Sequence, residues 1–322
     1  MARSASATAI DPAMVLSHKF PEVTRLSLAL RPRSPDSSGL TRAALFYRDV
    51  ALYALGVGAC NADAADEKEL QLVYHRDGQS SIKVLPTFIS VLNAKTGDGF
   101  YMDVPGLHYD PALLLHGKAA ILEVETLTCL EGSGEVLCMN RSTVYLRGAG
   151  GFSNSSQPFS YATYPSNEVS DVTFPDSTPF AVYEDRTQKS QALLCGLSGY
   201  FHPLHSDPIF AQTAGFTGPI LPGLSTLGFA VRAIMRSFCN MEPTAVKGIS
   251  CRFLHHVYPG ETLVTEMWLE GQRCYGGLDL PEKEEEQWLR EGGGNARGAL
   301  GAVTAPQAGV PLQRELLDRE RK

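Results

Sequence analysis

The stretch 197–208, which reads LSGYFHPLHSDP, holds two histidines separated by a proline and a leucine. His202 and His205 could form half of a metal site, with His255 and His256 as the other half. Zinc sites need three or four convergent ligands, and no cysteine pair adds to these histidines. The residues therefore indicate no metal, and taken alone His205 is more typical of a loop histidine than of a base.

Three shorter patterns suggest other sites but fit none of them. The glycines of Arg147–Gly151 follow neither the dinucleotide fingerprint nor the P-loop, so they indicate a backbone bend rather than a phosphate site. Gly223-Leu-Ser225 lacks the G-x-S-x-G elbow of serine hydrolases. Asp207-Pro208 is typical of a helix N-cap followed by the first helical residue.

The composition of the 322 residues is that of a globular protein without a cationic surface. Hydrophobic residues make up 43% and charged residues 20%, and the formal net charge of −7 argues against sequence-independent binding to nucleic acid. The seven cysteines include no C-x-x-C pair, which is typical of a reduced, intracellular compartment. Prolines and glycines interrupt the uncharged stretch 208–231, which favours a buried core segment over a membrane span.

The elements that would position these residues fall into two blocks of similar size. In the first block the spacing predicts a helix from Tyr47 to the glycines at 56–58, short strands at Leu70–His75 and Ile82–Leu85, and a strand within Leu137–Gly151. In the second it predicts a short helix from Pro208 to Ala214, an apolar helix over Pro222–Cys239, and strands at Gly248–Leu254 and Thr262–Leu269.

The segments around these blocks have less pattern. Residues 1–46 include a Ser/Pro/Arg-rich inserted loop at 25–45, and the polar residues 153–191 are interpreted as a surface linker. Residues 273–322 hold eight glycines and a charged run, which predicts a disordered tail without strands. The blocks then become domains of 47–152 and 192–272, and the recurrence of His108-Tyr-Asp-Pro111 as His205-Ser-Asp-Pro208 favours a duplication.

Several segments in collinear order resemble the peroxisomal type-2 enoyl-CoA hydratases, a MaoC-like family. The resemblance covers about two-thirds of the chain, and the opening IDPAMVLSHKFPEVT is similar to the plant monofunctional form. Its most specific part is the motif at 197–208 followed by AGFTGPILPGL at 214–224. Further matching segments lie at 47–60, 84–88, 113–117, 140–152 and 246–273.

This resemblance implies an α+β fold of two hotdog repeats, each a long helix wrapped by an antiparallel sheet. The implied reaction adds water to a trans-2-enoyl-CoA to give the (3R)-3-hydroxyacyl-CoA, with no metal and no cofactor. A carboxylate and an imidazole would hold the water, and a backbone N–H at a helix start would stabilise the enolate oxygen. His205 matches the family's histidine, Gly223 its oxyanion-binding amide, and His116, Gly117 and Phe253 its substrate contacts, although Phe253 is equally plausible as a core strand residue.

The same motif departs from the family at its catalytic carboxylate. Tyr200 stands at the aspartate position, His202 at an asparagine position beside the substrate, and Pro222 at the histidine before Gly223. Tyrosine loses its proton near a pKa of about 10, so Tyr200 is a poor base at neutral pH. Loss of one acid–base partner predicts a rate reduced about 10²–10⁴-fold. The alternative is a non-catalytic acyl-CoA-binding or assembly protein derived from this family.

The first repeat also departs in length. His116-Gly117 runs directly into Lys118–Leu122, so about 20–30 residues, the length of a strand pair with turns, are missing relative to the family. The family's closing strands are replaced by the tail that begins near Cys274. Both repeats are therefore expected to be incomplete, with open sheet edges.

The resemblance also concerns partners and location. It implies an acyl-CoA thioester substrate, a homodimer and a peroxisomal location, and neither nucleic acid nor a membrane is expected as a partner. The chain ends in Glu320-Arg321-Lys322, which does not match a Ser-Lys-Leu-type peroxisomal signal.

Overall fold

The computed structural model describes residues 47–95 and 177–270 apart from Arg252 and Leu254, together with the segments 25–27, 42–44, 119–129, 133–147, 273–279 and 298–304. The chain divides into two compact units that interleave along the sequence. The first unit is Met1–Glu168, Thr187–Gly228 and His256–Glu261. The second unit is Val169–Arg186, Phe229–His255 and Thr262–Lys322.

The first unit has a helical core that begins with α2 (Tyr47–Gly56), which confirms the helix predicted there. Its buried Tyr53 ring lies 5.3 Å from the ring of Phe88, the first residue of α4 (Phe88–Lys95). The side-chain amide of Gln191 donates to the carbonyl of Gly56 at 2.7 Å, and Gln191 opens α5 (Gln191–Leu197). Both ends of this bond are buried, so it fixes α5 against α2.

The strands predicted at Leu70–His75 and Ile82–Leu85 are wrong. The first of these regions follows α3 (Glu67–Leu70), and the second follows the short 3-10 helix η1 (Gln79–Ser81). The Asp66 side chain accepts hydrogen bonds from the backbone N–H groups of Lys68 and Glu69. This cap favours a helical turn, and it outweighs the apolar alternation that suggested a strand.

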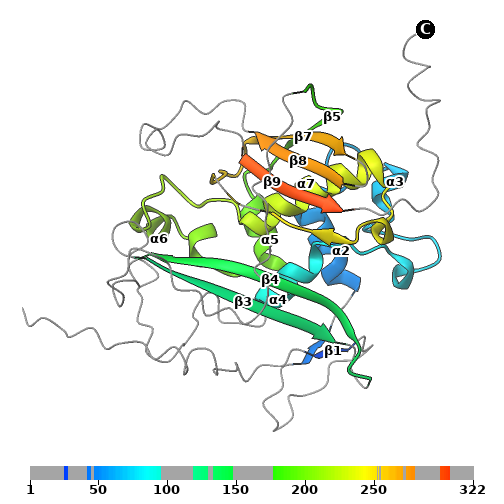
Figure 1. Ribbon diagram of the computed structural model, residues 1–322, viewed down its shortest axis with the longest axis horizontal. Helices are drawn as coiled ribbons and strands as arrows, with labels where there is room; N and C mark the ends of the chain where they lie inside the picture. The colour runs from blue at the N-terminus through cyan, green and yellow to red at the C-terminus, as the bar shows by residue number, and fades with distance from the viewer. Residues whose placement is uncertain are drawn as a thin grey trace, which may run out of the picture. The chain divides into compact units, whose positions relative to one another are not determined.

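The described strands of the first unit form two small sheets. β1 (Arg25–Ser27) and β2 (Arg42–Ala44) pair in parallel, inside the region predicted to be only a loop. β3 (Ala119–Cys129) and β4 (Val136–Arg147) form a long antiparallel ribbon, with an irregularity between Thr128 and Cys129 (Figure 1). β4 confirms the strand predicted within Leu137–Gly151.

The second unit contains a five-stranded antiparallel sheet in the order β5-β7-β8-β9-β6. Leu263, Thr265 and Met267 alternate along β7 and are all buried, so one face of this strand packs on the core. Figure 1 shows β7, β8 and β9 lying side by side. The strands are β5 (Ala181–Arg186), β6 (Gly248–Ile249), β7 (Thr262–Glu270), β8 (Arg273–Asp279) and β9 (Gly298–Thr304).

Three expectations about this sheet are corrected. The predicted linker 153–191 contains β5, the predicted strand at Gly248–Leu254 is reduced to Gly248–Ile249, and the predicted strandless tail contains β8 and β9. The glycine content of 273–322 contributed to the prediction of a disordered tail. Gly276 and Gly277 are instead buried within the strand, opposite Met267 and Glu266 of β7.

The apolar helix predicted over 222–239 is confirmed as α7 (Gly223–Phe238). In the first unit, a Cβ added to Gly228 would lie 2.4 Å from Val57 Cγ1 and 2.8 Å from the Tyr53 hydroxyl, so glycine permits a close approach to α2. In the second unit, the buried Arg232 guanidinium pairs with the carboxylate of Asp185 on β5. The helices and antiparallel sheets together confirm the α+β class.

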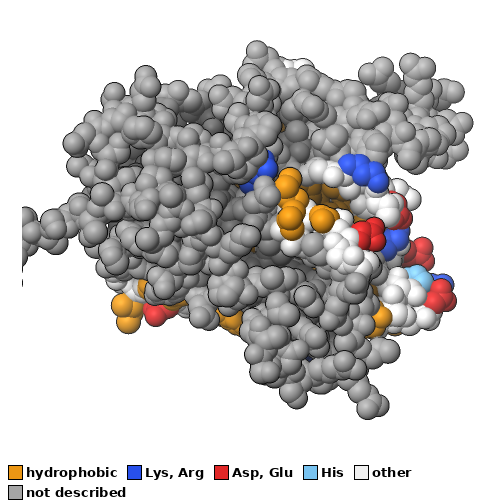
Figure 2. All heavy atoms as spheres, turned by 60° about the horizontal axis from the view of Figure 1, so that its bottom comes forward, with side chains coloured by type: hydrophobic (Ala, Val, Ile, Leu, Met, Phe, Trp, Pro, Cys, Tyr) orange, Lys and Arg blue, Asp and Glu red, His pale blue; other side chains and the backbone are white. Residues whose placement is uncertain are grey.

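The described part of the face shown in Figure 2 is not dominated by one sign of charge. Acidic and basic side chains are interspersed on the described part of the face in Figure 2, and a small group of hydrophobic side chains lies beside them. Among the described residues, no helix has the length and hydrophobicity to cross a lipid bilayer.

Candidate active site

His205 is the buried histidine of the predicted motif and ends the short 3-10 helix η2 (Pro203–His205). Its Nδ1 lies 2.8 Å from the carbonyl oxygen of Ile220. A carbonyl can only accept, so Nδ1 carries the proton and the lone pair of the neutral ring is on Nε2. The pKa of His205 is lowered to about 4, because burial lowers it more than the bond to the Ile220 carbonyl raises it, and the nearby His202 adds a smaller decrease. His205 is therefore a neutral imidazole that can accept a proton at Nε2.

His202 lies at the N-terminal cap of the same turn. Its Nδ1 accepts the backbone N–H of Leu204 at 3.2 Å, and its ring centroid is 5.8 Å from that of His205. Burial lowers the pKa of His202, so this imidazole is also neutral at neutral pH. Because Nδ1 accepts, the ring proton of His202 is on Nε2.

Tyr200 lies against His205, as the family motif predicts for the missing aspartate. The two ring centroids are 5.5 Å apart and the planes are tilted by 35°. Burial raises the pKa of the Tyr200 phenol above its usual value, and the neighbouring Cys195 thiol raises it further. The phenol is therefore protonated at neutral pH and can donate a hydrogen bond, but it cannot take a proton from water.

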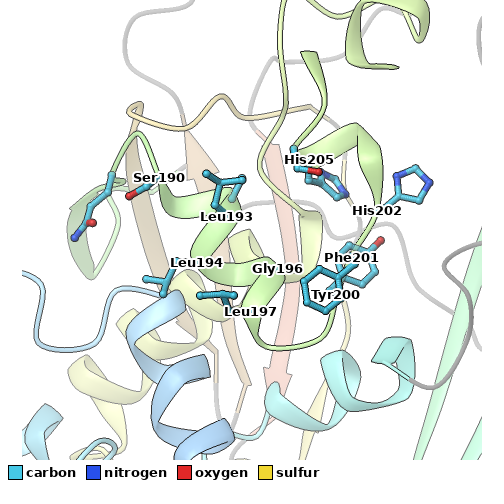
Figure 3. A pocket seen from close by; sticks show the side chains of 12 residues that line it. Ser190, Leu193, Leu194, Gly196, Leu197, Tyr200, Phe201, His202 and His205 are labelled. Atoms are coloured by element: carbon cyan, nitrogen blue, oxygen red, sulfur yellow. The ribbon is translucent and has the colours of Figure 1, made fainter. Parts of the chain in front are cut away.

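These residues line a cavity of about 530 Å³ in the first unit. α5 contributes apolar side chains, including Leu193 and Leu197, and the loop that follows contributes Tyr200, His202 and His205 (Figure 3). The cavity therefore has an apolar wall and an imidazole-bearing wall. This arrangement suits a ligand with an apolar part and one reacting group.

Gly223, the predicted oxyanion donor, is the first residue of α7. The carbonyl of the preceding Pro222 accepts from the N–H groups of Ser225 and Thr226, at 2.9 and 3.1 Å, which sets the first turn. An N–H at the first helical position has no acceptor within its own helix, and the helix dipole is positive there. The Gly223 amide is thus of the right kind to stabilise an enolate oxygen.

Ile220 connects the histidine loop to the start of this helix. Its carbonyl accepts from His205, and its N–H donates to the carbonyl of Leu204 at 3.3 Å. The next residue, Leu221, donates to the carbonyl of Val257 at 2.7 Å. Sequence reasoning missed Ile220, because a backbone carbonyl acts whatever the side chain and leaves no signal in the residue type.

The remaining predicted substrate contacts are His116, Gly117 and Phe253. His116 and Gly117 lie outside the described residues. Phe253 belongs to the second unit, is 50% exposed and lies outside any strand, which corrects its placement on a long strand at 248–254. Within the described part of the chain, no group of three or more His, Cys, Asp or Glu side chains could hold a metal ion.

Comparison with known proteins decides the family. Residues 172–283 match the family model described as MaoC like domain, and residues 45–121 match the MFE-2 hydratase 2 N-terminal domain. A peroxisomal enoyl-CoA hydratase 2 of Arabidopsis thaliana is 51% identical over 302 residues, which are 84% of this chain and 91% of that protein. The chain belongs to the enoyl-CoA hydratase 2 family.

Longer and more distant relatives support the same family assignment. The peroxisomal multifunctional enzyme type 2 of Mus musculus is 36% identical over 70% of this chain, which is 33% of that longer protein. The crystal structure of a MaoC-like dehydratase from Phytophthora capsici has a TM-score of 0.58 and 25% identity, over 81% of this chain and 93% of that one. These matches confirm the MaoC-like hotdog fold, while the boundaries proposed for the two repeats stay predictions.

Proposed function

We propose that this chain is an (R)-specific 2-enoyl-CoA hydratase of fatty-acid β-oxidation, which adds water to a trans-2-enoyl-CoA to give the (3R)-3-hydroxyacyl-CoA. The observation that carries the proposal is the hydrogen bond from His205 Nδ1 to Ile220, at 2.8 Å. It leaves the Nε2 lone pair as the base of a histidine that lines the cavity. Membership of the enoyl-CoA hydratase 2 family supports the choice of reaction.

The proposed reaction uses His205 Nε2, the Gly223 N–H and one water molecule. His205 Nε2 takes a proton from water as the water oxygen bonds to C3 of the enoyl group. The electron pair of the double bond moves through C2 toward the thioester, and the enolate oxygen is stabilised by the Gly223 N–H. The imidazolium then returns the proton to C2, so the ring is regenerated neutral.

We infer that the rate is reduced by Tyr200. A carboxylate at this position would accept a hydrogen bond from the attacking water and orient it, and a protonated phenol cannot replace its charge. The ring also lies beside His205, with 5.5 Å between centroids, where a bound water would be held. Loss of one acid–base partner gives an expected decrease of about 10²–10⁴-fold relative to a site with aspartate.

The test measures binding and turnover on the same purified full chain. Hydration is followed as loss of the enoyl thioester, and the stereochemistry of the product is determined by chiral chromatography. Binding is measured by calorimetry with the same enoyl-CoA. A slow reaction that gives the 3R product and disappears in His205→Ala supports the proposal, whereas the 3S product or an unchanged rate in His205→Ala contradicts it.

Tyr200 also supports a second candidate function, a non-catalytic acyl-CoA-binding or assembly protein. Its protonated phenol removes the charge that hydration uses, while the apolar wall formed by Leu193 and Leu197 is kept. Binding of enoyl-CoA without any turnover above the uncatalysed rate would favour this function over the hydratase.

We further propose a peroxisomal location and a homodimer. The location is supported by the Arabidopsis and mouse relatives, both of which are peroxisomal enzymes. The homodimer is supported by the family resemblance. Co-localisation of the full-length protein with a peroxisomal marker tests the first, and sedimentation equilibrium of the purified chain tests the second.

A further inference from the structure

His202 and His205 are linked by a ring of main-chain and side-chain hydrogen bonds. His202 Nδ1 accepts the Leu204 N–H at 3.2 Å, and the His202 carbonyl accepts the His205 N–H at 3.0 Å. The Leu204 carbonyl accepts the Ile220 N–H at 3.3 Å, and the Ile220 carbonyl accepts the His205 Nδ1–H at 2.8 Å. The main chain of Leu204 is therefore held at its N–H by His202 and at its carbonyl by Ile220.

We propose that His202 is a positioning residue, which caps the turn Pro203–His205 and thereby fixes His205 as the Nδ1–H tautomer with its base on Nε2. The capping bond holds the Pro203–Leu204 peptide. The Leu204 carbonyl that follows accepts the Ile220 N–H, and this bond keeps the Ile220 carbonyl within reach of the His205 ring. Without the cap, the Leu204 N–H loses its acceptor and the turn loses one of its bonds. His205 would then populate both tautomers, because no carbonyl would be held in place as its partner.

The cap also fixes the tautomer of His202 itself. A ring nitrogen that accepts a backbone N–H carries no proton, so the neutral His202 ring has its proton on Nε2. Its ring meets the ring of Phe210 edge-on, with 5.6 Å between centroids and 89° between planes. The two contributions of His202, the acceptor nitrogen and the ring, can be separated by substitution.

Asparagine and phenylalanine separate these contributions. Asn retains an acceptor that can cap the Leu204 N–H, because asparagine is among the preferred N-cap residues, but it removes the ring. Phe retains a ring of similar shape against Phe210 but removes the acceptor. If His202 positions His205 through the cap, His202→Asn keeps the His205 tautomer and His202→Phe loses it.

The experiment records long-range ¹H–¹⁵N correlations of the full chain labelled with [¹⁵N]histidine, at neutral pH and without substrate. Signals of His202 and His205 are assigned from their disappearance in His202→Asn and His205→Gln. The wild type should show His202 protonated on Nε2 and His205 protonated on Nδ1. His202→Asn should keep the His205 pattern, and His202→Phe should convert it to Nε2–H or to an average of both tautomers.

Several outcomes would overturn the proposal. These are a wild-type His202 protonated on Nδ1, an unchanged His205 tautomer in His202→Phe, or equal loss of the tautomer in His202→Asn and His202→Phe. If His202→Phe does not fold, His202→Ala takes its place, because it also removes the acceptor and should likewise lose the His205 tautomer. The catalytic use of His205 rests on the proposed function, but the spectra require no turnover, so the two proposals can fail separately.

Discussion

The imidazole of His205 is held by the backbone carbonyl of Ile220, with 2.8 Å between Nδ1 and the oxygen. The partner is neutral, so it fixes the ring without adding the charge that a carboxylate would. This explains how burial can lower the pKa of His205 to about 4 while the ring stays oriented. The base that remains is well placed but weak. Position 200, where the family resemblance implies a carboxylate, is therefore the most informative site for substitution.

Tyr200→Asp should raise the rate of hydration of a trans-2-enoyl-CoA by at least about tenfold, because it restores a carboxylate beside His205. Hydration kinetics and a circular dichroism spectrum of the folded variant measure this. Tyr200→Phe is the matched control, since it removes the hydroxyl without adding a charge and should give no gain. A folded Tyr200→Asp variant that binds enoyl-CoA but turns over no faster than wild type would refute the acid–base assignment.

His205→Gln should make the stability of the chain less sensitive to acid. The pKa of His205 is lowered from 6.5 to about 4, so between these values the unfolded state binds a proton that the folded state does not. Stability is therefore present above pH 6.5 and is lost as pH falls toward 4. The difference in melting temperature between pH 7 and pH 5 should be larger for wild type than for His205→Gln, and equal differences would contradict the lowered pKa.

Gly228→Ala should destabilise the chain by about 1–3 kcal/mol, because its Cβ would lie 2.4 Å from Val57 Cγ1 in a packed interior. Gly218→Ala is the control, since no atom lies within 4 Å of its added Cβ, and it should be near neutral. Chemical denaturation measures both. Adding Val57→Ala to Gly228→Ala should recover part of the loss, and the absence of recovery would show that Val57 is not the limiting contact.

Arg232→Ala should cost about 3–5 kcal/mol, since it leaves the Asp185 carboxylate buried without its ion pair. Arg232 also lies over the rings of Tyr183 and Phe229, at 5.7 and 5.8 Å from their centroids, so its removal costs ring contacts as well. Urea denaturation measures the change. The double variant Asp185→Leu with Arg232→Met should be more stable than Arg232→Ala, and a double variant equally destabilised would argue against the buried charge as the cause.

The sequence predicted correctly the elements whose signals lie in neighbouring residues. The helix from Pro208 begins at Asp207, whose side chain accepts from Ile209 and Phe210 as an N-cap should, and its proline stands at the first helical position. α7 is a largely apolar segment of 16 residues, a length that favours a buried helix over a strand. Both signals are contained in a few neighbouring residues.

The elements that sequence missed depend on partners distant in the chain. β8 contains two adjacent glycines and β9 is rich in glycine and alanine. They become strands because β8 pairs with β7 on one side and with β9 on the other. For the site, the motif predicted that Tyr200, His202 and His205 lie together, and the ring contacts show that they do. The acceptor for His205 could not be predicted, because Ile220 acts through its carbonyl.

The use of a main-chain carbonyl to anchor His205 has a consequence for how this site tolerates change over evolutionary time. Substitution of Ile220 by another aliphatic residue leaves the carbonyl in place, and only proline would remove the N–H that bonds to Leu204. The hydrogen bond that orients His205 is therefore retained after most point substitutions of Ile220. If Tyr200 occupies the carboxylate position that the family resemblance implies, a single substitution there places a carboxylate beside an imidazole that is still held in orientation.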